Sequence, residues 1–261
     1  MTTSQVTIRR WEAAFWPLLA MTLIVLVWFT LVKWSGTRTF PSPMDVERGL
    51  AELVRKGLLW KYTADSLFRV GTGYGLAVVC GIPLGLLLAW YPAAATTVNP
   101  VIQMLRPISP LAWIPLSIVW FGTSNMAAIF LIFLASFFPI VVSTANGVRE
   151  VPSMFRQAGG NFGLSPVALL RRVVFPAALP KILVGLRIAL GIAWLVVVAA
   201  EMIAVNSGLG YLIIDSRNAG KRYDLVVAGM LLIGVIGLGL DFGIRRLEKW
   251  KSVRWGFHHE N

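Results

Sequence analysis

Long stretches without a charged residue dominate this sequence and constrain its fold most strongly. The longest of them are residues 15–32, 70–105, 107–148 and 225–240. A helix that spans a bilayer needs about 20 mainly apolar residues, so the two longest stretches must contain turns. With 57% hydrophobic and only 14% charged residues, the chain is also far more apolar than an ordinary soluble domain. The sequence therefore predicts an all-α integral membrane protein with several spans.

About six membrane-spanning helices account for this pattern. The expected spans are residues 15–32, 68–90, 101–121, 126–148, 182–200 and 225–244. Arg9 and Arg10 precede the first span and no small-residue cleavage site follows it, which favours an uncleaved helix with the N-terminus in the cytoplasm. A basic, tryptophan-containing end after the last span is typical of the inner interface and predicts a cytoplasmic C-terminus as well.

The chain divides into three predicted parts. Residues 1–66 hold the first span and an outer amphipathic helix, residues 67–246 form the core, and residues 247–261 form a basic cytoplasmic tail. Ser42-Pro43 followed by Asp45 is typical of a helix start, which places the beginning of the outer helix. Its apolar positions recur at helical spacing, and they are Val46, Leu50, Leu53, Val54 and Leu58.

The third span carries three prolines, Pro107, Pro110 and Pro115, directly after Arg106. Proline removes a backbone donor and bends a helix. Within a membrane such a bend is tolerated only against protein or a water-filled cavity. We therefore expect this span to be bent and sheltered from lipid.

Charge and reactive side chains exclude several functional classes. The net charge of +12 comes from short basic clusters beside apolar runs, which membrane topology explains better than nucleic-acid binding. The single cysteine, Cys80, provides neither a disulfide framework nor a thiolate metal site, and His258-His259 alone cannot complete a tetrahedral metal site. HExxH and GxSxG motifs are absent from the sequence and Asp241 is the one aspartate within a span, so we predict no catalytic residue and no metal.

Residues 149–182 form the polar segment around which the rest of the chain is organised. Pro152 suits the first turn of a helix, Gly163 suits a helix end, and Ser165-Pro166 suits the cap of a second helix. We expect two short cytoplasmic helices that meet at Gly163. The second helix should end around two prolines, Pro176 and Pro180.

Small residues mark the first of these helices. Ala158, Gly159 and Gly160 leave one helix face almost without side chains, which indicates close approach by a partner. The alternative is a loosely structured linker, but the caps and helix ends argue for order.

This segment resembles the cytoplasmic loop motif of ATP-binding-cassette importer permeases, which reads Glu-Ala-Ala, three residues, Gly, nine residues, Ile-x-Leu-Pro. Here the motif is Gln157-Ala158-Gly159, then Gly163, then Val173-Val174-Phe175-Pro176, with the same spacing. The departures are Gln157, Gly159, Val173 and Phe175, and the loss of the acidic residue at Gln157 removes any salt bridge from that position. Four further segments are similar to the nitrate, sulfonate, taurine and bicarbonate branch of this family, namely residues 40–74, 105–122, 185–202 and 208–213.

The resemblance implies a type I importer permease fold, like that of the methionine permease, in a bacterial inner membrane. It implies three kinds of protein partner besides membrane lipid: a second permease copy, two cytosolic ATPases and an extracytoplasmic solute-binding protein. ATP would be bound by the ATPases, since this chain has no GxxxxGK[ST] loop and needs no cofactor of its own. The residues that would couple to the ATPases are Gln157, Ala158, Gly159, Gly163, Val173 and Pro176. The solute would be a small oxyanion: nitrate, a sulfonate such as taurine, or bicarbonate.

Charged residues within the spans are candidates for the translocation path. Arg187 and Glu201 lie within about 40° of one helix face but roughly 21 Å apart along the axis, so they cannot pair directly and both could line one path. Arg106 and Arg187 are expected near the inner side, where Asp241 could neutralise Arg187. Structural pairing and a role in the solute path both remain open for these residues.

Two other classes of protein remain as alternatives. A channel or secondary transporter would work without ATP, but secondary transporters often show an internal repeat, and the two halves of this sequence show none. An intramembrane enzyme is the second alternative, and it lacks a recognisable catalytic motif here.

Overall fold

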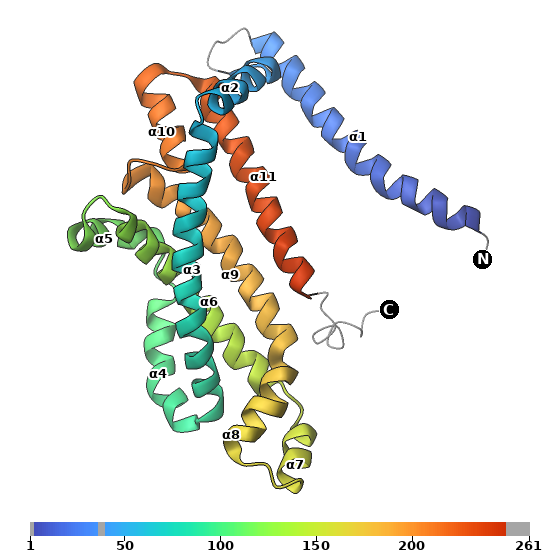
Figure 1. Cartoon of the computed structure of the whole chain (residues 1–261), viewed down its shortest axis with the longest axis vertical. Coiled ribbons are helices and arrows are strands. Elements are labelled where there is room, and N and C mark those ends of the chain that lie inside the picture. The colour runs from blue at the N-terminus through green and yellow to red at the C-terminus, as the bar shows by residue number, and fades with distance from the viewer. Residues whose placement is uncertain (1–2, 36–39, 249–261) are drawn as a thin grey trace. The chain divides into compact units, whose positions relative to one another are not determined.

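The computed structural model describes residues 3–35 and 40–248 and is helical throughout the ordered elements (Figure 1). Two compact units are present: residues up to Trp60 together with Ile213–Leu231, and Lys61–Leu212 together with the chain from Leu232 onward. The helices are α1 (Thr3–Ser35), α2 (Pro43–Arg55), α3 (Leu58–Trp90), α4 (Pro92–Leu105), η1 (Pro110–Trp113), α5 (Ile114–Phe121), α6 (Asn125–Arg149), α7 (Ser153–Asn161), α8 (Pro166–Leu169), the π-turn η2 (Leu170–Val174), α9 (Phe175–Ile203), α10 (Leu209–Gly220) and α11 (Tyr223–Glu248).

The all-α membrane fold predicted from the sequence is confirmed. Four helices are long and apolar enough to cross a membrane: Leu58–Trp90, Asn125–Arg149, Pro166–Ile203 and Tyr223–Arg246. The bent pair α4 and η1–α5 passes the same test as a single broken span, which gives up to five. The first predicted span corresponds to the shorter apolar segment Leu18–Trp34 within α1. Most of the predicted basic tail, residues 249–261, and His258-His259 lie outside the described residues.

The third span was predicted as one bent helix, but the structure has two separate helical pieces there. α4 ends at Leu105 and the chain bends by 83° before η1 and α5. Pro107 lies in the break, while Pro110 begins η1. Each proline lacks an N–H donor and disfavours helical geometry in the residue before it, so prolines this close together end the helix rather than kink it.

The second helix of the polar segment was predicted to end around Pro176 and Pro180, and this prediction is wrong. α8 continues through the π-turn into α9, so that Pro166–Ile203 is one helix of 38 residues. A proline ring crowds the carbonyl four residues earlier, and for Pro176 that residue is Arg172, which lies within the π-turn. The wider hydrogen-bonding pattern of a π-turn accommodates the proline without ending the helix.

The core of the second unit is built on α6, which packs against both α3 and α9. At Gly85 of α3, a Cβ atom would lie 2.6 Å from the Cβ of Thr144, and at Gly81 it would lie 2.9 Å from Ile140. Glycine therefore lets α3 and α6 approach closely, as small residues do between membrane helices. This close packing places the glycine-containing face of α3 inside the bundle.

In the first unit, α2 begins with the predicted cap. The Ser42 hydroxyl accepts a hydrogen bond from the Asp45 backbone N–H at 3.3 Å, and the Ser42 N–H donates to the Asp45 carboxylate at 3.1 Å. Val46 and Leu53 are buried, whereas Val54 is half exposed. The amphipathic helix is therefore confirmed as far as Arg55, with a narrower apolar face than its sequence predicts. Leu58 was predicted to belong to this face, but it begins α3, because Gly57 at φ 70° separates the two helices.

Candidate functional site

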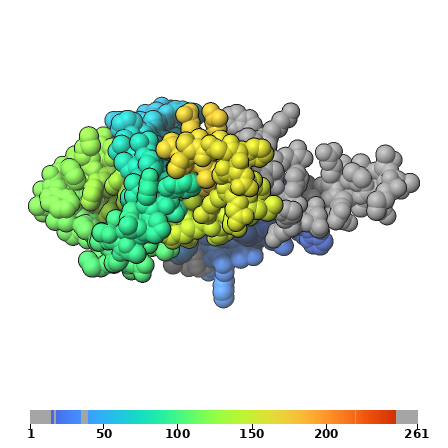
Figure 2. Space-filling model, turned by 90° about the horizontal axis from the view of Figure 1, so that it is seen from below, coloured from blue at the N-terminus to red at the C-terminus, as the bar shows by residue number. Residues whose placement is uncertain are grey.

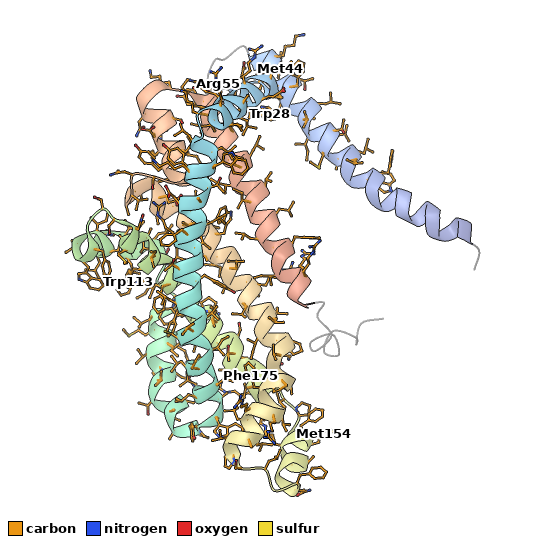
Figure 3. The ribbon with its side chains drawn as sticks, viewed as in Figure 1. Trp28, Met44, Arg55, Trp113, Met154 and Phe175 are labelled. Carbon is orange, nitrogen blue, oxygen red and sulfur yellow. The ribbon has the colours of Figure 1, made fainter. Side chains whose placement is uncertain are left out.

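The polar segment at 149–182 forms one end of the second unit. Its helices α7 and α8 lie beside the α3–α4 turn at this end of the unit (Figures 1 and 2). α7 and its C-cap residue expose large apolar side chains, with Met154 at 65% and Phe162 at 86% exposure. Figure 3 shows Met154 on the outer side of α7. Gln157 and Ala158 are exposed on the same short helix. An apolar surface on an otherwise polar segment is typical of a contact site for another protein.

Gly159 was expected to be open to a partner protein. It is instead buried against another helix of the same chain. A Cβ atom at this position would overlap Leu169 of α8 and would lie 3.6 Å from Val173. The glycine thus serves the packing of α7 on α8. Gly163 adopts φ 73°, a left-handed conformation that glycine permits, and it ends the α7 turn as predicted. Ser165 caps α8 by accepting a hydrogen bond from Ala168 at 3.4 Å.

Arg156 fixes α7 to the end of α6. Its guanidinium donates to the carbonyl oxygens of Val148 at 3.1 Å and of Arg149 and Val151 at 3.4 Å. These carbonyls lie at and just beyond the C-terminal end of α6, where a positive charge is favourable to the helix dipole. Below them, Val148 and Val151 pack with the fully buried Val174 of the π-turn. Arg156 therefore joins the exposed helix to a membrane span.

A buried polar cluster occupies the opposite end of the second unit, where α6 begins. We call it the Arg69–Glu201 network, and it comprises Ser66, Arg69, Asn125, Glu201, Ser207 and the backbone N–H groups of Leu209 and Gly210. Arg69 is 1% and Glu201 0% exposed. The Glu201 carboxylate accepts hydrogen bonds from Arg69 at 2.6 Å, from Ser66 at 2.9 Å and from the Gly210 backbone at 2.9 Å.

The Arg69 guanidinium uses donors on all three nitrogens within this network. Two go to the Asn125 side-chain oxygen at 2.8 and 3.0 Å, and others go to the backbone and hydroxyl oxygens of Ser207 at 2.8 and 2.5 Å. A Cβ atom at Gly208, which has φ 106°, would overlap the Glu201 carboxylate. The network therefore joins α3, α6, α9 and the start of α10, and its charges are satisfied within the unit.

This arrangement changes the interpretation of Glu201. The residue was predicted as a lining residue of the translocation path, but in this conformation its side chain is fully buried and ion-paired. Arg69, Ser66 and Asn125 were not among the predicted site residues. The available signal was an arginine directly before the long charge-free run of residues 70–105.

Arg187 and Asp241 form the ion pair that the sequence suggested. Arg187 Nε lies 2.6 Å from Asp241 Oδ1, and Arg245 also contacts Asp241 at 2.8 Å. Both members of the pair are partly exposed. The charge of Arg187 is therefore neutralised where α9 and α11 meet in this conformation.

Arg106 stands at the break after α4 and lines a cavity of about 240 Å³ with Phe138 and Pro139 of α6 and Ile192 of α9. Within the described residues, its guanidinium makes no side-chain hydrogen bond or ion pair. Arg106 thus differs from Arg69 and Arg187, which both pair with an acid. Its position beside a broken helix fits the expectation that the break faces a cavity.

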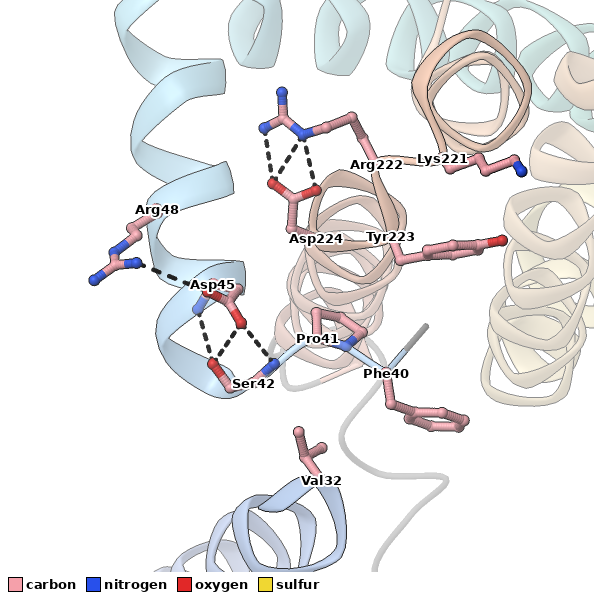
Figure 4. Close-up of a pocket in the computed structure, with 10 residues that line it drawn as sticks. All are labelled: Val32, Phe40, Pro41, Ser42, Asp45, Arg48, Lys221, Arg222, Tyr223 and Asp224. Atoms are coloured by element: carbon pink, nitrogen blue, oxygen red, sulfur yellow. Dashed lines mark hydrogen bonds and ion pairs between the residues drawn. The ribbon is translucent and has the colours of Figure 1, made fainter. Parts of the chain in front are cut away.

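A separate cavity of about 540 Å³ lies in the first unit (Figure 4). Its lining includes Ser42, Asp45, Arg48 and Asp224. The charged groups largely pair with one another, since Arg222 contacts both Asp224 at 2.7 Å and Glu52 at 2.6 Å. These hydrogen bonds raise the pKa of Arg222 and hold the pKa of Glu52 down at about 2. Most of the charged groups that line this cavity are therefore used in local pairs, with Lys221 as the exception among the described residues.

Residues 81–253 match the family described as the inner membrane component of binding-protein-dependent transport systems. The match covers well over half of the chain. The chain belongs to this family. It is therefore a permease, a multi-pass protein of the inner membrane, and it falls within the nitrate, sulfonate, taurine and bicarbonate branch.

Curated relatives of this permease cover most of its length. An ABC transporter permease protein of Methanocaldococcus jannaschii is 46% identical over 74% of this chain and 72% of its own. The taurine transport system permease protein TauC of Escherichia coli is 34% identical over 88% of this chain and 86% of its own. The bicarbonate transport system permease protein CmpB of Synechococcus elongatus is 35% identical over 90% of this chain and 88% of its own.

Solved structures confirm the type I permease fold. An inward-facing form of the MetNI methionine ABC transporter aligns with a TM-score of 0.62 at 22% identity, covering 75% of this permease and 94% of that chain. The bacterial alginate ABC transporter, solved in complex with an alginate-bound periplasmic protein, aligns with a TM-score of 0.58 at 16% identity, covering 92% of this permease and 97% of that chain.

Proposed function

We propose that this permease forms the membrane path of an ATP-driven importer for a small oxyanion: nitrate, a sulfonate such as taurine, or bicarbonate. The names of the Escherichia coli and Synechococcus elongatus relatives support this class of solute. An extracytoplasmic solute-binding protein would deliver the anion, and a second copy of the chain would complete the path. Both termini and residues 149–182 then lie in the cytoplasm.

Two cytosolic ATPase subunits would bind ATP and contact the permease through α7 and α8. The observation that carries this part of the proposal is the exposed apolar surface made by Met154 and Phe155 of α7 and by its C-cap residue Phe162. Arg156 ties this helix to α6. Around this surface the proposed coupling residues are Gln157, Ala158, Gly159, Gly163, Val173 and Pro176. Gly159 would act indirectly, because it holds α7 against α8.

A reconstituted assembly tests the proposal. Permease and its ATPase are placed in liposomes, and ATP hydrolysis is measured with empty binding protein, with binding protein loaded with nitrate, taurine or bicarbonate, and without binding protein. We expect loaded binding protein to stimulate hydrolysis, and accumulation of the labelled anion to identify the solute. If the rate of ATP hydrolysis is the same with and without loaded binding protein, the result would contradict an importer and favour a channel or secondary transporter.

Ala158→Arg tests the contact itself. A charged side chain on an exposed position of α7 would have to lose its water in an apolar contact, which costs several kcal/mol. We expect stimulated hydrolysis and uptake to fall to the unstimulated level, with an unchanged amount of permease in the membrane. Gly160→Arg is the matched control. Gly160 is also exposed, but it lies about 200° away from Ala158 around the axis of α7, and a Cβ atom added there would meet open space. Normal uptake by Ala158→Arg would contradict the coupling role.

A further inference from the structure

Two cavities follow one face of α6 and α9. The cavity of about 240 Å³ beside Arg106 is bounded by Pro139 of α6 and Ile192 of α9. A second cavity, of about 420 Å³, is lined by Ser143 and Asn146 of α6 and by Lys181 and Ile188 of α9. Residues three or four positions apart share a helix face. The two cavities are therefore successive parts of one groove, which we call the α6–α9 groove.

The floor of this groove is formed by close packing of its two helices. A Cβ atom at Gly185 would overlap the Ser143 side chain, and one at Gly147 would lie 3.2 Å from the Cβ of Lys181. The small residues bring the helix backbones together beneath the groove. The side chains at its rim, such as Asn146 and Ile188, are exposed.

Several polar side chains in the groove lack partners in the part of the chain that the structure describes. Among the described residues, the side chains of Arg106, Ser143 and Asn146 make no hydrogen bond to protein. Unsatisfied polar groups at membrane depth are costly against lipid and face protein or a water-filled cavity instead. Three of them along one face, from two adjacent cavities, indicate that the groove holds water or a polar ligand rather than lipid tails.

The charge in the groove changes along its length. Arg106 carries a positive charge at the broken helix that no described acidic residue pairs with, while Ser143 and Asn146 offer neutral hydrogen-bond donors further along. At the end next to α7, the ammonium of Lys181 is paired with the carboxylate of Glu150. An anion would therefore be attracted most strongly near Arg106 and held less tightly toward the end of the groove. Weakening attraction along a path favours release, as conduction requires.

We propose that the α6–α9 groove is the inner part of the solute path and takes a small oxyanion. Arg106 attracts the anion, Ser143 and Asn146 donate hydrogen bonds to its oxygens, and the Lys181–Glu150 pair stands at the cytoplasmic exit. This inference rests on the proposed import of an anion and assigns the path to particular residues.

Thiol labelling with small charged reagents tests the groove directly. In a Cys80→Ser background, which removes the exposed native cysteine, Ile192→Cys places a thiol beside Arg106 and Asn146→Cys places one further along. Val79→Cys, 69% exposed on α3, is the control for an exposed position outside the groove, and Ala189→Cys, 0% exposed, is the buried control. The reagents are methanethiosulfonates with an ethylsulfonate or an ethyltrimethylammonium group, applied to the assembled transporter without ATP.

We expect both groove thiols to react with the reagents while the control thiols do not. The ratio of anionic to cationic labelling rates at Ile192→Cys should fall about threefold to tenfold when Arg106→Gln is added, because one nearby positive charge is lost. Arg106→Lys keeps the charge and should keep the ratio. At Asn146→Cys the same change should be smaller, because the thiol lies further from Arg106.

Two results would overturn the inference: groove thiols that react no faster than the controls, or a labelling ratio that Arg106→Gln leaves unchanged. An unchanged ratio is decisive because labelling itself shows that the variant is assembled and accessible. Labelling does not depend on ATP or binding protein. If the groove thiols do not react but binding protein still stimulates ATP hydrolysis, only this inference is contradicted. If the labelling-rate ratio changes as expected but binding protein does not stimulate ATP hydrolysis, only the importer proposal is contradicted.

Discussion

Two regions of the second unit hold the same kinds of side chain in opposite states. In the Arg69–Glu201 network, an arginine, an asparagine and two serines are bonded to one another and to an acid. In the α6–α9 groove, an arginine, an asparagine and a serine have no such partners among the described residues and line cavities. A charged residue at membrane depth is therefore not by itself a sign of a solute path. What separates structure from transport is whether its hydrogen bonds are already used.

Breaking the network should produce the largest loss of stability. Arg69→Leu leaves the buried Glu201 carboxylate without its counter-charge, which should lower the free energy of unfolding by about 3–5 kcal/mol. Denaturant unfolding of the purified permease in detergent measures this loss. Arg69→Met combined with Glu201→Leu removes both charges and should recover much of it. A double variant as unstable as the single one would show that the charge pair is not the cause.

Removing the groove arginine should have the opposite result. Arg106→Gln takes away a charge that has no partner among the described residues, so the free energy of unfolding should change by less than about 0.5 kcal/mol. Anion uptake by the reconstituted transporter should fall by roughly tenfold, since about 1.4 kcal/mol of attraction is lost. Arg106→Lys should restore most of the uptake. If Arg106→Gln unfolds the permease as Arg69→Leu does, the two regions do not differ as described.

The same contrast can be tested on neighbouring residues of α7. Gly159→Leu forces a side chain into Leu169 and should cost about 1–3 kcal/mol of local stability through overpacking, whereas Ala158→Leu adds a side chain to an exposed position and should cost little. Hydrogen exchange of the α7 amides measures the difference. Equal protection in the two variants would show that α7 can move away from α8 at no cost.

The exposed ion pairs of the first unit should give the smallest effect. Hydrogen bonds from Arg222 and Lys56 lower the pKa of Glu52 from 4.5 to about 2 in the folded state. The stabilising contribution of Glu52 is therefore present above a pH of about 4.5 and is lost as the pH falls toward about 2. The difference in unfolding free energy between the native chain and Glu52→Gln should be small, as for other exposed pairs, and should shrink over this range. A difference that grows on acidification would contradict this pairing.

Local features of the fold could be predicted from the sequence because their causes lie within a few residues. The cap at Ser42 and Asp45, the left-handed Gly163 and the cap at Ser165 all depend on such short spacings. The extent of α8 could not be predicted in this way. Prolines usually end helices, and only the π-turn before Phe175 shows how this one continues past Pro176.

Long-range pairing was the part of the site that the sequence did not reveal. Arg69 and Glu201 are 132 residues apart, and no local pattern joins them. Helical geometry correctly excluded a direct pair between Arg187 and Glu201, and Asp241 proved to be the partner of Arg187. The partners of Gly159 likewise lie on another helix, so its small size was first attributed to a different protein. In each case the missing information was tertiary packing.

The continuous helix from Pro166 to Ile203 has a consequence for how the two ends of the permease are linked. It carries Val173 near the proposed ATPase contact and Lys181, Ile188 and Ile192 of the groove on one axis about 57 Å long. A rotation of α8 about that axis would rotate the groove side chains through the same angle, less any twist that is absorbed by deformation of the π-turn between them. A π-turn fits one residue more into a turn than an α-turn does, so deleting one residue there should leave an ordinary α-turn and keep α8 and the groove side chains in nearly the same angular phase. A deletion elsewhere in the helix would shift that phase by about 100°.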